Sequence, residues 1–418
     1  MTEYYLCIDL KSFYASVECA ERNLDPFQVN LVVADQSRGN GAITLAATPA
    51  IKKLGVKSRG RIYEIPQHIE YITAMPRMAL YMEYAAKIYS ICLKYIAHDD
   101  IHVYSIDESF LDITSYLKLY QMSPQETACM IMQDIYDETR ITATCGIGTN
   151  LYLAKIALDI TAKHSPDNIG FLNEQLYQET LWHHQPLTDF WMIGQGTKRR
   201  LQAFGIKDMY DIAHAPEKLL YQIFGINACY LIDHAWGQEP VKMADIKAYK
   251  PKSNSISNSQ ILFEDYNWQD ACLVMKEMIE SNIYRLIEHH LVTNHISLYI
   301  GYSKNVIKPS RGSCHIGVTT NSNTILLNEF KQLYQRIINP DYPVRQIAVA
   351  FHSVKDEIYE QYDLFTDDKA IAKEKRLQEA LLKIKKKYGK NAVLKGMNYL
   401  DKATAKKRNT LIGGHNAQ

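Results

Sequence analysis

Apolar and polar residues alternate or recur along the first 165 residues in a way that predicts both strands and helices. Strands are predicted at 4–10, 30–35, 102–107, 109–114 and 143–149. Helices are predicted at 12–23, 46–54, 76–97, 124–138 and 150–162. This mixture indicates the α/β (α+β) class for the N-terminal part of the chain.

The remaining residues show three further patterns. Residues 171–240 contain short helical stretches that are interrupted by glycines, and residues 241–253 contain few apolar residues, which predicts a linker. Residues 254–356 predict strand, helix, strand, strand, helix, strand. That βαββαβ order suits a small sheet with helices on one face. A basic helix is predicted at 368–388, followed by a polar tail.

Composition narrows the class of protein. A chain of 418 residues predicts about two to four domains. The eight cysteines include no CxxC pair, so a reducing cytoplasm is expected rather than a zinc ribbon or a disulfide framework. No signal peptide and no apolar stretch of about 18 residues is found, so no membrane contact is expected.

Charge is distributed unevenly along the chain. Residues 366–418 carry fourteen Lys and Arg against five Asp and Glu, a net charge of +9, and the other residues sum to −8. A basic tail is typical of contact with a polyanion. A solvated helix face is the alternative interpretation.

The stretch YSIDESFLDI, residues 104–113, contains two adjacent acids. Neighbours on a strand point to opposite faces, so either Asp107 or Glu108 should face the core, where an unpaired carboxylate is costly. Either a hairpin turn exposes both acids, or a cation is bound. Asp9 ends the first predicted strand. Three carboxylates at adjacent strand ends are the ligands that a pair of Mg²⁺ ions requires.

The stretches IDLKSFYASVE and YSIDESFLDI resemble the signature motifs of the Y-family DNA polymerases, the translesion enzymes, and most closely those of the UmuC branch. The resemblance extends through nearly the whole chain. It implies a right-hand polymerase with a palm, fingers, a helical thumb with a helix-hairpin-helix, and a little finger. The implied parts are palm 1–19 and 76–170, fingers 20–75, thumb 171–240, linker 241–253, little finger 254–356 and C-terminal tail 357–418.

The resemblance also implies roles for individual residues. Asp9, Asp107 and Glu108 match the catalytic triad that binds two Mg²⁺ ions, with Leu10 as a further metal-binding position. Tyr14 matches the steric gate that excludes ribonucleotides, because a 2′-OH would collide with its ring. A core tyrosine at a helix start is the alternative for Tyr14.

The incoming dNTP requires positive charge and backbone amides. The turn formed by Lys11, Ser12, Phe13 and Tyr14 is expected to bind the triphosphate through its amides. Lys163 matches a family lysine, although His164 and Ser165 separate it from Pro166. In the fingers, either Lys52 or Lys53 is expected to contact the triphosphate. The tyrosine that the family has in the fingers is absent, and we infer that Pro49 takes its place. Lys53 and Lys155, taken singly, are expected to be solvated surface charges.

Two regions are expected to contact primer–template DNA without reading its sequence. In the thumb, glycines that let the backbone approach a phosphate precede a cluster of cations. These residues are Gly194, Gly196, Lys198, Arg199 and Arg200, and FGINA at 224–228 is a candidate second half of the motif. Tight helix connections are the alternative. In the little finger, Ser253, Ser255, Ser257, Ser259, Arg311 and Ser313 are expected to contact phosphates.

Two short motifs remain. GIGT at 146–149 resembles part of a dinucleotide-binding fingerprint, but Leu151 occupies the position of the third glycine, so that interpretation is rejected. EQYDLF at 360–365 fits the QxxLF pattern of bacterial sliding-clamp ligands through Gln361, Leu364 and Phe365. A turn packed on the little finger is the alternative.

The expected function is error-prone, template-directed DNA synthesis past lesions in the SOS response to DNA damage. The expected partners are primer–template DNA, dNTP and a sliding clamp, with a RecA filament as a further candidate. Two alternatives are a non-catalytic DNA-damage scaffold that binds primer DNA, clamp and RecA, and a palm-type nucleotide cyclase.

Overall fold

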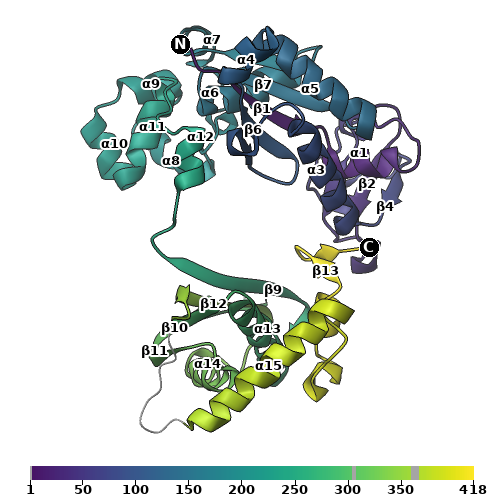
Figure 1. The fold of residues 1–418 in the computed structure, drawn as a ribbon, viewed down its shortest axis with the longest axis vertical. Coiled ribbons are helices and arrows are strands. Elements are labelled where there is room, and N and C mark those ends of the chain that lie inside the picture. The colour runs from purple at the N-terminus through teal and green to yellow at the C-terminus, as the bar shows by residue number, and fades with distance from the viewer. Residues whose placement is uncertain (1, 304–306, 359–366) are drawn as a thin grey trace. The chain divides into compact units, whose positions relative to one another are not determined.

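The computed structural model describes residues 2–303, 307–358 and 367–418 (Figure 1). The chain divides into two compact units. The first unit contains Met1–Tyr249 and His415–Gln418, and the second contains Lys250–Gly414. Within the part of the chain that the structure describes, no helix combines the length and apolar character that a membrane crossing requires.

A five-stranded sheet forms the centre of the first unit, with the order β5-β6-β1-β7-β8. Strand β1 is antiparallel to both of its neighbours, β6 and β7, and β8 is parallel to β7. The bounds are β1 Tyr5–Leu10, β5 Ile101–Val103, β6 Glu108–Asp112, β7 Ala143–Gly148 and β8 Ile169–Leu172. All residues of β1 except Asp9 are buried, which its apolar sequence YLCIDL explains.

The GIGT stretch allows a helix to pack directly against this sheet. Helix α6 (Leu151–Ile156) contacts β1 and β7. A Cβ atom added at Gly146 would lie 2.1 Å from the carbonyl oxygen of Ala154, and one added at Gly148 would lie 2.1 Å from the Ala154 amide. The two glycines are therefore required for close helix–sheet packing, which agrees with the rejection of a nucleotide-binding loop.

Three more helices accompany the sheet: α3 (Met78–Cys92), α4 (Thr114–Tyr120) and α5 (Pro124–Thr139). Helices α3 and α5 contact each other, and α5 contacts β7. Helix α5 begins with a capping box, in which Ser123 accepts a hydrogen bond from the Glu126 amide and the Glu126 carboxylate accepts one from the Ser123 amide.

A smaller sheet with the order β3-β2-β4 follows helix α1 (Phe13–Ala20). Its strands are β2 Leu31–Ala34, β3 Thr44–Ala47 and β4 Ile72–Ala74. The helix predicted at 46–54 is wrong at its start, because strand β3 extends to Ala47 and α2 spans only Pro49–Lys53. Proline is favourable at the first position of a helix, where its missing amide costs nothing.

Residues 174–248 form six short helices, the first five of which pack around a core that includes Tyr177, Phe190 and Leu201. They are α7 Glu174–Leu181, α8 Gln195–Gln202, α9 Met209–His214, α10 Glu217–Phe224, α11 Ala228–Ala235 and α12 Met243–Ala248. Helix α12 lies within the stretch predicted as a linker. Its Met243 is buried in a cluster with Tyr5 and Phe110 of the five-stranded sheet.

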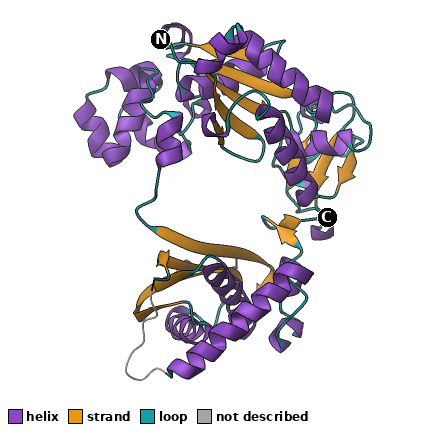
Figure 2. Cartoon of the chain, in the orientation of Figure 1, coloured by secondary structure: helices purple, strands orange, loops and turns teal. Residues whose placement is uncertain are grey.

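The second unit has the predicted βαββαβ order (Figure 2). The elements are β9 Asn254–Tyr266, α13 Trp268–Glu288, β10 Leu291–Tyr302, β11 Ser310–Thr320, α14 Asn323–Ile337 and β12 Val344–Asp356. The antiparallel sheet has the order β11-β10-β12-β9. Ile296, Phe330 and Phe351 belong to the core between the sheet and the helices, which leaves the other sheet face exposed.

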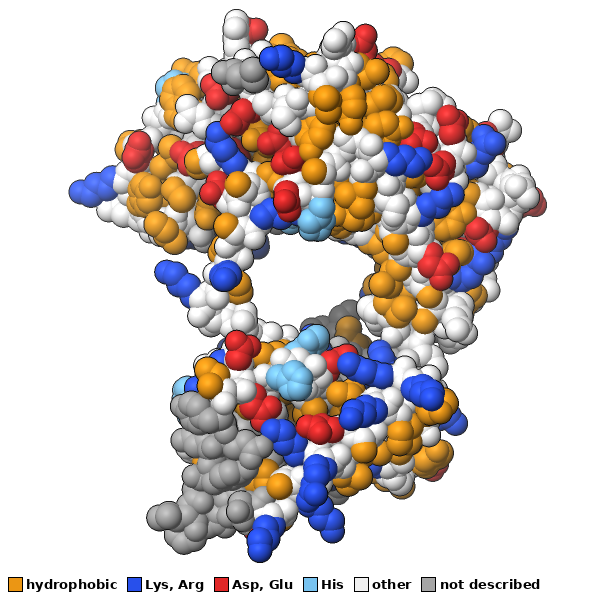
Figure 3. All heavy atoms as spheres, in the orientation of Figure 1, with side chains coloured by type: hydrophobic (Ala, Val, Ile, Leu, Met, Phe, Trp, Pro, Cys, Tyr) orange, Lys and Arg blue, Asp and Glu red, His pale blue; other side chains and the backbone are white. Residues whose placement is uncertain are grey.

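The C-terminal residues as far as Gly414 belong to this second unit, and His415–Gln418 belong to the first. Helix α15 (Asp368–Tyr388) has the bounds predicted for the basic helix, and it contacts α13. Lys and Arg side chains are frequent on the visible face of this unit (Figure 3). The last short elements are α16 (Ala405–Arg408), β13 (Leu411–Ile412) and β14 (His415–Asn416).

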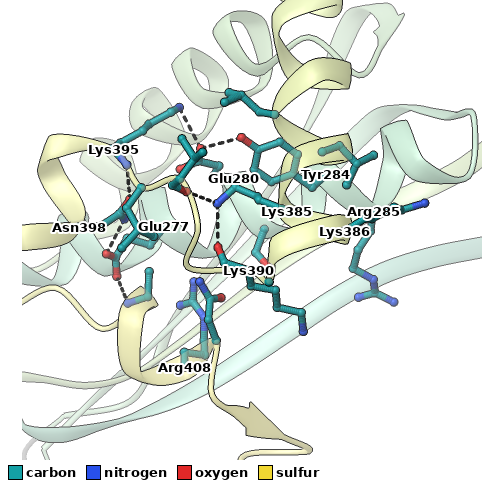
Figure 4. A pocket seen from close by; sticks show the side chains of 18 of the residues that line it. Glu277, Glu280, Tyr284, Arg285, Lys385, Lys386, Lys390, Lys395, Asn398 and Arg408 are labelled. Carbon is teal, nitrogen blue, oxygen red and sulfur yellow. Dashed lines mark hydrogen bonds and ion pairs between the residues drawn. The ribbon is translucent and has the colours of Figure 1, made fainter.

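A buried carboxylate joins α13 to the segment after α15 (Figure 4). Glu277 is only 2% exposed. It accepts hydrogen bonds from Asn398 Nδ2 at 2.8 Å and from the amides of Thr404 at 2.8 Å and Ala405 at 2.9 Å. A cavity of about 580 Å³ lies between α13, α15 and residues 389–409.

Candidate active site

Strand register brings two of the three acids together. Asp9 of β1 lies directly opposite Glu108 of β6, so both side chains lie on the same face of the sheet. Asp107 precedes Glu108, in the turn that follows β5. The Leu10 amide donates a hydrogen bond to the backbone carbonyl oxygen of Asp107 at 2.9 Å. Ser105 Oγ donates to Asp107 Oδ1 at 2.6 Å. The adjacent acids thus lie at a turn beside the end of β1.

Two lysines from the α6 region lie against these acids. Lys155 Nζ contacts Glu108 Oε1 at 2.8 Å and Asp159 Oδ2 at 3.0 Å. Lys163 Nζ contacts Asp159 Oδ1 at 2.7 Å and Asp9 Oδ2 at 3.7 Å. Lys155 is only 6% exposed, so its interpretation as a solvated surface charge is wrong.

A local irregularity of the helix accompanies this arrangement. Helix α6 continues into a π-helical turn, Ala157–Thr161, which contains Asp159. Such turns are rare and are found often at functional sites. Asp159 contacts both lysines, each four residues away, so the three side chains form a charge-alternating series.

Burial and crowding perturb the carboxylate of Asp9. Burial raises the pKa of Asp9 to about 6, and Lys163 opposes that rise. Asp107 and Glu108 add to the rise because their negative charges disfavour a third ionised carboxylate. Additional positive charge at this site would therefore stabilise the ionised state of Asp9.

The acids are suitable ligands for a hard divalent cation. Carboxylate oxygens are the groups that Mg²⁺ prefers. Across residues 2–303, 307–358 and 367–418, no three His, Cys, Asp or Glu side chains are arranged to hold a metal ion. Lys155 and Lys163 instead lie against Glu108 and Asp9.

Tyr14 lies close to the acids. It occupies the first turn of α1, after Ser12, whose φ of 51° is in the left-handed region. Burial and then the Asp107 carboxylate raise the pKa of Tyr14. The ring stacks on Tyr81 of α3, with centroids 4.5 Å apart. The structure therefore brings Tyr14 to the same site as the acids.

Lys52 reaches the site through a side-chain hydrogen bond, and the charge of Lys53 acts on Lys11. Lys52 Nζ donates to Ser12 Oγ at 2.7 Å. Burial lowers the pKa of Lys52, and Asp9, Lys163 and Lys11 are the charges that act on it. Lys52 is therefore a neighbour of both the acids and the other lysines.

The remaining residues of the β1–α1 turn have separate contacts. Lys11 Nζ donates to Asn168 Oδ1 at 2.6 Å and lies over the Phe27 ring. Phe13 is buried in the protein. The Lys11 amide donates to the Thr142 carbonyl oxygen at 2.9 Å, so the amides of Ser12, Phe13 and Tyr14 are the ones in this turn that could bind an anion.

In the helical region, Gly194 caps α8, which carries Lys198, Arg199 and Arg200. A Cβ atom added at Gly194 or Gly196 would meet nothing within 4 Å, so internal packing does not require these glycines. Arg200 lies over the Phe224 ring at 4.4 Å.

The exposed face of the second unit's sheet carries several residues predicted to contact phosphates. They line an open groove of about 630 Å³. Its polar lining residues include Ser257, Ser259, Ser297, Tyr299, Arg311 and Ser313. The predicted clamp-binding residues Gln361, Leu364 and Phe365 lie outside the described residues.

Three residues at the site were missed from the sequence. The spacing of Asp159, four residues from Lys155 and from Lys163, was an available signal for a shared helix face. Tyr81 and Glu18, which support Tyr14, are separated from each other by 63 residues, and no local pattern connects them.

Known proteins share this architecture. Residues 8–159 match the impB/mucB/samB family, and residues 253–364 match the C-terminal domain of that family. The UvrX protein of Bacillus subtilis (strain 168) is 32% identical over 416 residues, which is 98% of this chain and 97% of that protein. DNA polymerase IV 2 of the same organism is 28% identical over 98% of this chain and 97% of its own length.

Among solved structures, the Y-family DNA polymerase chimera Dbh-Dpo4(243-245)-Dbh aligns with a TM-score of 0.66. It covers 84% of this chain and 99% of its own, at 22% identity. The predicted α+β fold of a right-hand Y-family polymerase is thereby confirmed. The chain belongs to the impB/mucB/samB family and is a UmuC-like Y-family DNA polymerase.

Proposed function

We propose that the chain extends DNA primers past template lesions as part of the SOS response. The observation that carries the proposal is the set of Asp9, Asp107 and Glu108 at the β1–β6 edge, next to Tyr14 and the lysines. A scaffold without catalysis has no use for this crowding of carboxylates, which costs free energy.

Asp9, Asp107, Glu108 and the backbone carbonyl of Leu10 would hold two Mg²⁺ ions. When bound, such ions neutralise charge on the reacting phosphates and orient the attacking and leaving oxygens. The pKa of Asp9, raised to about 6 by burial and its acidic neighbours, supports this assignment, because cations would relieve that crowding.

The triphosphate of the incoming dNTP would be bound by Lys52, Lys163 and the first amides of α1. Lys52 Nζ already donates a hydrogen bond to Ser12 Oγ, at the start of that helix. Lys163 lies near Asp9 at 3.7 Å and is partly exposed, so it can turn toward a phosphate. The helix start adds unpaired amides and the positive end of its dipole.

Tyr14 would act as the steric gate. Its ring is stacked on Tyr81, so it would resist displacement by a 2′-OH better than a freely rotating side chain. A deoxyribose would fit against the ring, and a ribose would collide with it.

DNA would be bound by the helical region and by the second unit. Gly194, Gly196 and the cations of α8 would contact backbone phosphates, because those glycines have open space around them. The Ser- and Arg-lined groove on the second unit's sheet would do the same. Palm 1–19 and 76–170, fingers 20–75, thumb 171–240 and little finger 254–356 are the proposed domains, with a sliding clamp and a RecA filament as proposed partners.

Primer extension on undamaged and abasic templates tests the proposal. The wild-type chain should insert dNTPs in a template-directed manner, and Asp107→Ala should lose insertion by several orders of magnitude while retaining DNA binding. Formation of a cyclic nucleotide and pyrophosphate from a nucleoside triphosphate, without primer extension, would support the nucleotide cyclase alternative. DNA binding without any synthesis would support the scaffold alternative.

A further inference from the structure

Three histidines form a row across the second unit's sheet. His295 of β10 lies directly opposite His315 of β11 on one side and His352 of β12 on the other. The His295 and His315 rings stack with centroids 4.1 Å apart and planes inclined by 18°. The His295 and His352 centroids are 5.0 Å apart. The three rings therefore make one continuous patch of imidazole.

This histidine row lies on the exposed face of the sheet. Ile296 and Phe351, the adjacent residues in the strands, are buried in the core on the other face. Ser297 Oγ lies 2.8 Å from His352 Nε2, which fixes the orientation of that ring. Since Ser297 also lines the groove described above, the row and the groove are neighbouring parts of one surface.

Cations and carboxylates are equal in number on the four strands, and two of the three carboxylates are already paired with a cation. Within the four strands, the cations are Arg311, Arg345 and Lys355, and the carboxylates are Glu264, Asp265 and Asp356. Glu264 is paired with Lys402, and Asp265 with Arg345. Asp356 lies at the end of β12, opposite Leu291. Burial, His315 and His352 all lower the pKa of His295, so a second proton on the row is opposed by the first.

We propose that the histidine row binds one backbone phosphate of duplex DNA and takes up a proton from solvent as it does so. A neutral imidazole has one N–H donor, and a protonated one has two. A phosphate placed over the row favours the protonated form, and it offsets the repulsion between neighbouring rings. The inference rests on the proposed DNA-binding function of this unit.

The row therefore makes DNA affinity depend on pH in a defined direction. Protons are bound more tightly in the complex than in the free chain, so affinity rises as pH falls through the histidine range. Arg311, which is always charged, supplies an attraction to phosphate that does not change over this range.

The test uses the full chain and a fluorescent primer–template at constant ionic strength. Binding should tighten by about threefold to tenfold from pH 8 to pH 6, and titration calorimetry in two buffers of different ionisation enthalpy should show net proton uptake. The triple variant His295→Gln, His315→Gln, His352→Gln should lose most of the pH dependence and the proton uptake. The loss of affinity relative to the wild type should be larger at pH 6 than at pH 8.

Controls separate this site from other causes. His289→Gln, in the same unit but outside the row, should leave the pH dependence intact. Arg311→Gln should weaken binding and reduce its salt dependence while leaving proton uptake unchanged. Thermal melting shows whether the triple variant is folded. If it is not, the single variant His315→Gln, at an exposed position, should still reduce proton uptake.

Unchanged pH dependence in the folded triple variant, or in His315→Gln if the triple variant does not fold, overturns the inference. So does the absence of proton uptake by the wild type. Either result leaves the polymerase proposal standing if primer extension is observed. A wild-type chain that binds no DNA at any pH contradicts the proposed function itself, which distinguishes the two failures.

Discussion

The ring of Tyr14 stacks on the ring of Tyr81, with centroids 4.5 Å apart and planes inclined by 15°. The Tyr81 hydroxyl donates to Glu18 Oε1 at 2.8 Å, and Arg77 donates to both oxygens of Glu18. Burial opposes ionisation of Glu18, but Arg77, Arg22 and Tyr81 hold its pKa below the usual value. Tyr81 is thus fixed at both its ring and its hydroxyl, and it provides a rigid support for Tyr14.

Replacing Tyr81 should weaken the proposed exclusion of ribonucleotides. Tyr81→Leu removes the stacking partner of Tyr14, and a stacked aromatic pair contributes about 0.5–1.5 kcal/mol, which is about twofold to tenfold in selectivity. The ratio of kcat/KM for dNTP over rNTP should fall by that amount. Tyr14→Ala should lower it further. Tyr81→Phe, which keeps the ring, should retain most of the selectivity. An unchanged ratio in an active Tyr81→Leu enzyme would show that Tyr81 only packs.

Replacing Lys155 should mainly lower the stability of the fold, and replacing Lys163 should mainly weaken the use of dNTP. Lys155 is buried beside Glu108, and removing one partner of a buried pair costs about 3–5 kcal/mol. Lys155→Met should therefore lower the free energy of unfolding, measured by denaturant titration. Lys163→Met, at a partly exposed position, should cost little stability and instead raise KM for dNTP.

A double variant provides the control. Lys155→Met with Glu108→Gln removes both charges and should recover part of the lost stability without recovering insertion activity. Equal destabilisation by the single Lys155→Met and Lys163→Met variants would contradict this division of roles.

Lys52 should contribute to dNTP binding and Lys53 should not. Lys52 Nζ lies 2.7 Å from Ser12 Oγ and close enough to Asp9 for their charges to interact. Lys52→Ala therefore removes a cation from the proposed triphosphate site. The expected rise in KM for dNTP is about tenfold, which corresponds to one charge-assisted hydrogen bond. Lys53→Ala is the matched control, one residue away, and should leave KM unchanged. The reverse result would place Lys53 at the triphosphate.

Parts of this site could be predicted from the sequence. Asp9 and Asp107–Glu108 stand at the ends of patterned strands, so a shared edge was a reasonable expectation, and the structure places Asp9 opposite Glu108. Lys155 was misjudged because helical periodicity does not show which face meets a sheet. The helix face that meets the sheet depends on Gly146 and Gly148, whose missing side chains let α6 pack closely against β7. The Tyr14–Tyr81 stack depends on long-range packing, which no local pattern encodes.

The segment around Gln361, Leu364 and Phe365 should provide the connection to a sliding clamp. Leu364→Ala with Phe365→Ala should remove stimulation of primer extension by the clamp, because short peptide ligands bind mainly through a few apolar anchors. Single-nucleotide insertion without clamp should be unchanged. Stimulation that persists would mean that the clamp binds elsewhere, and loss of basal insertion would mean that these residues belong to the fold.

Glu277 should determine whether residues 389–409 stay attached to α13. Its carboxylate accepts hydrogen bonds from Asn398, Thr404 and Ala405, and hydrogen bonds to a charged group are worth about 1.5–3 kcal/mol each. Glu277→Gln places an amide NH₂ among those donors, so at least one of them loses its acceptor. The segment should then open more often, and trypsin should cleave at Lys395 and Lys402 faster than in the wild type.

The matched control for Glu277 lies on the same helix. Glu280→Gln weakens the ion pair with Lys395, whose side chain is 47% exposed, and a hydrogen bond from the Tyr284 hydroxyl at 3.3 Å. Such partly exposed ion pairs contribute about 0–1 kcal/mol. Its tryptic pattern should resemble that of the wild type. Glu277 and Glu280 are not part of the hydrophobic core of the second unit. Single-nucleotide insertion should therefore be retained in both variants. Identical digestion of the two variants would mean that the segment is held by α15 and its own turns, and that the buried carboxylate is dispensable.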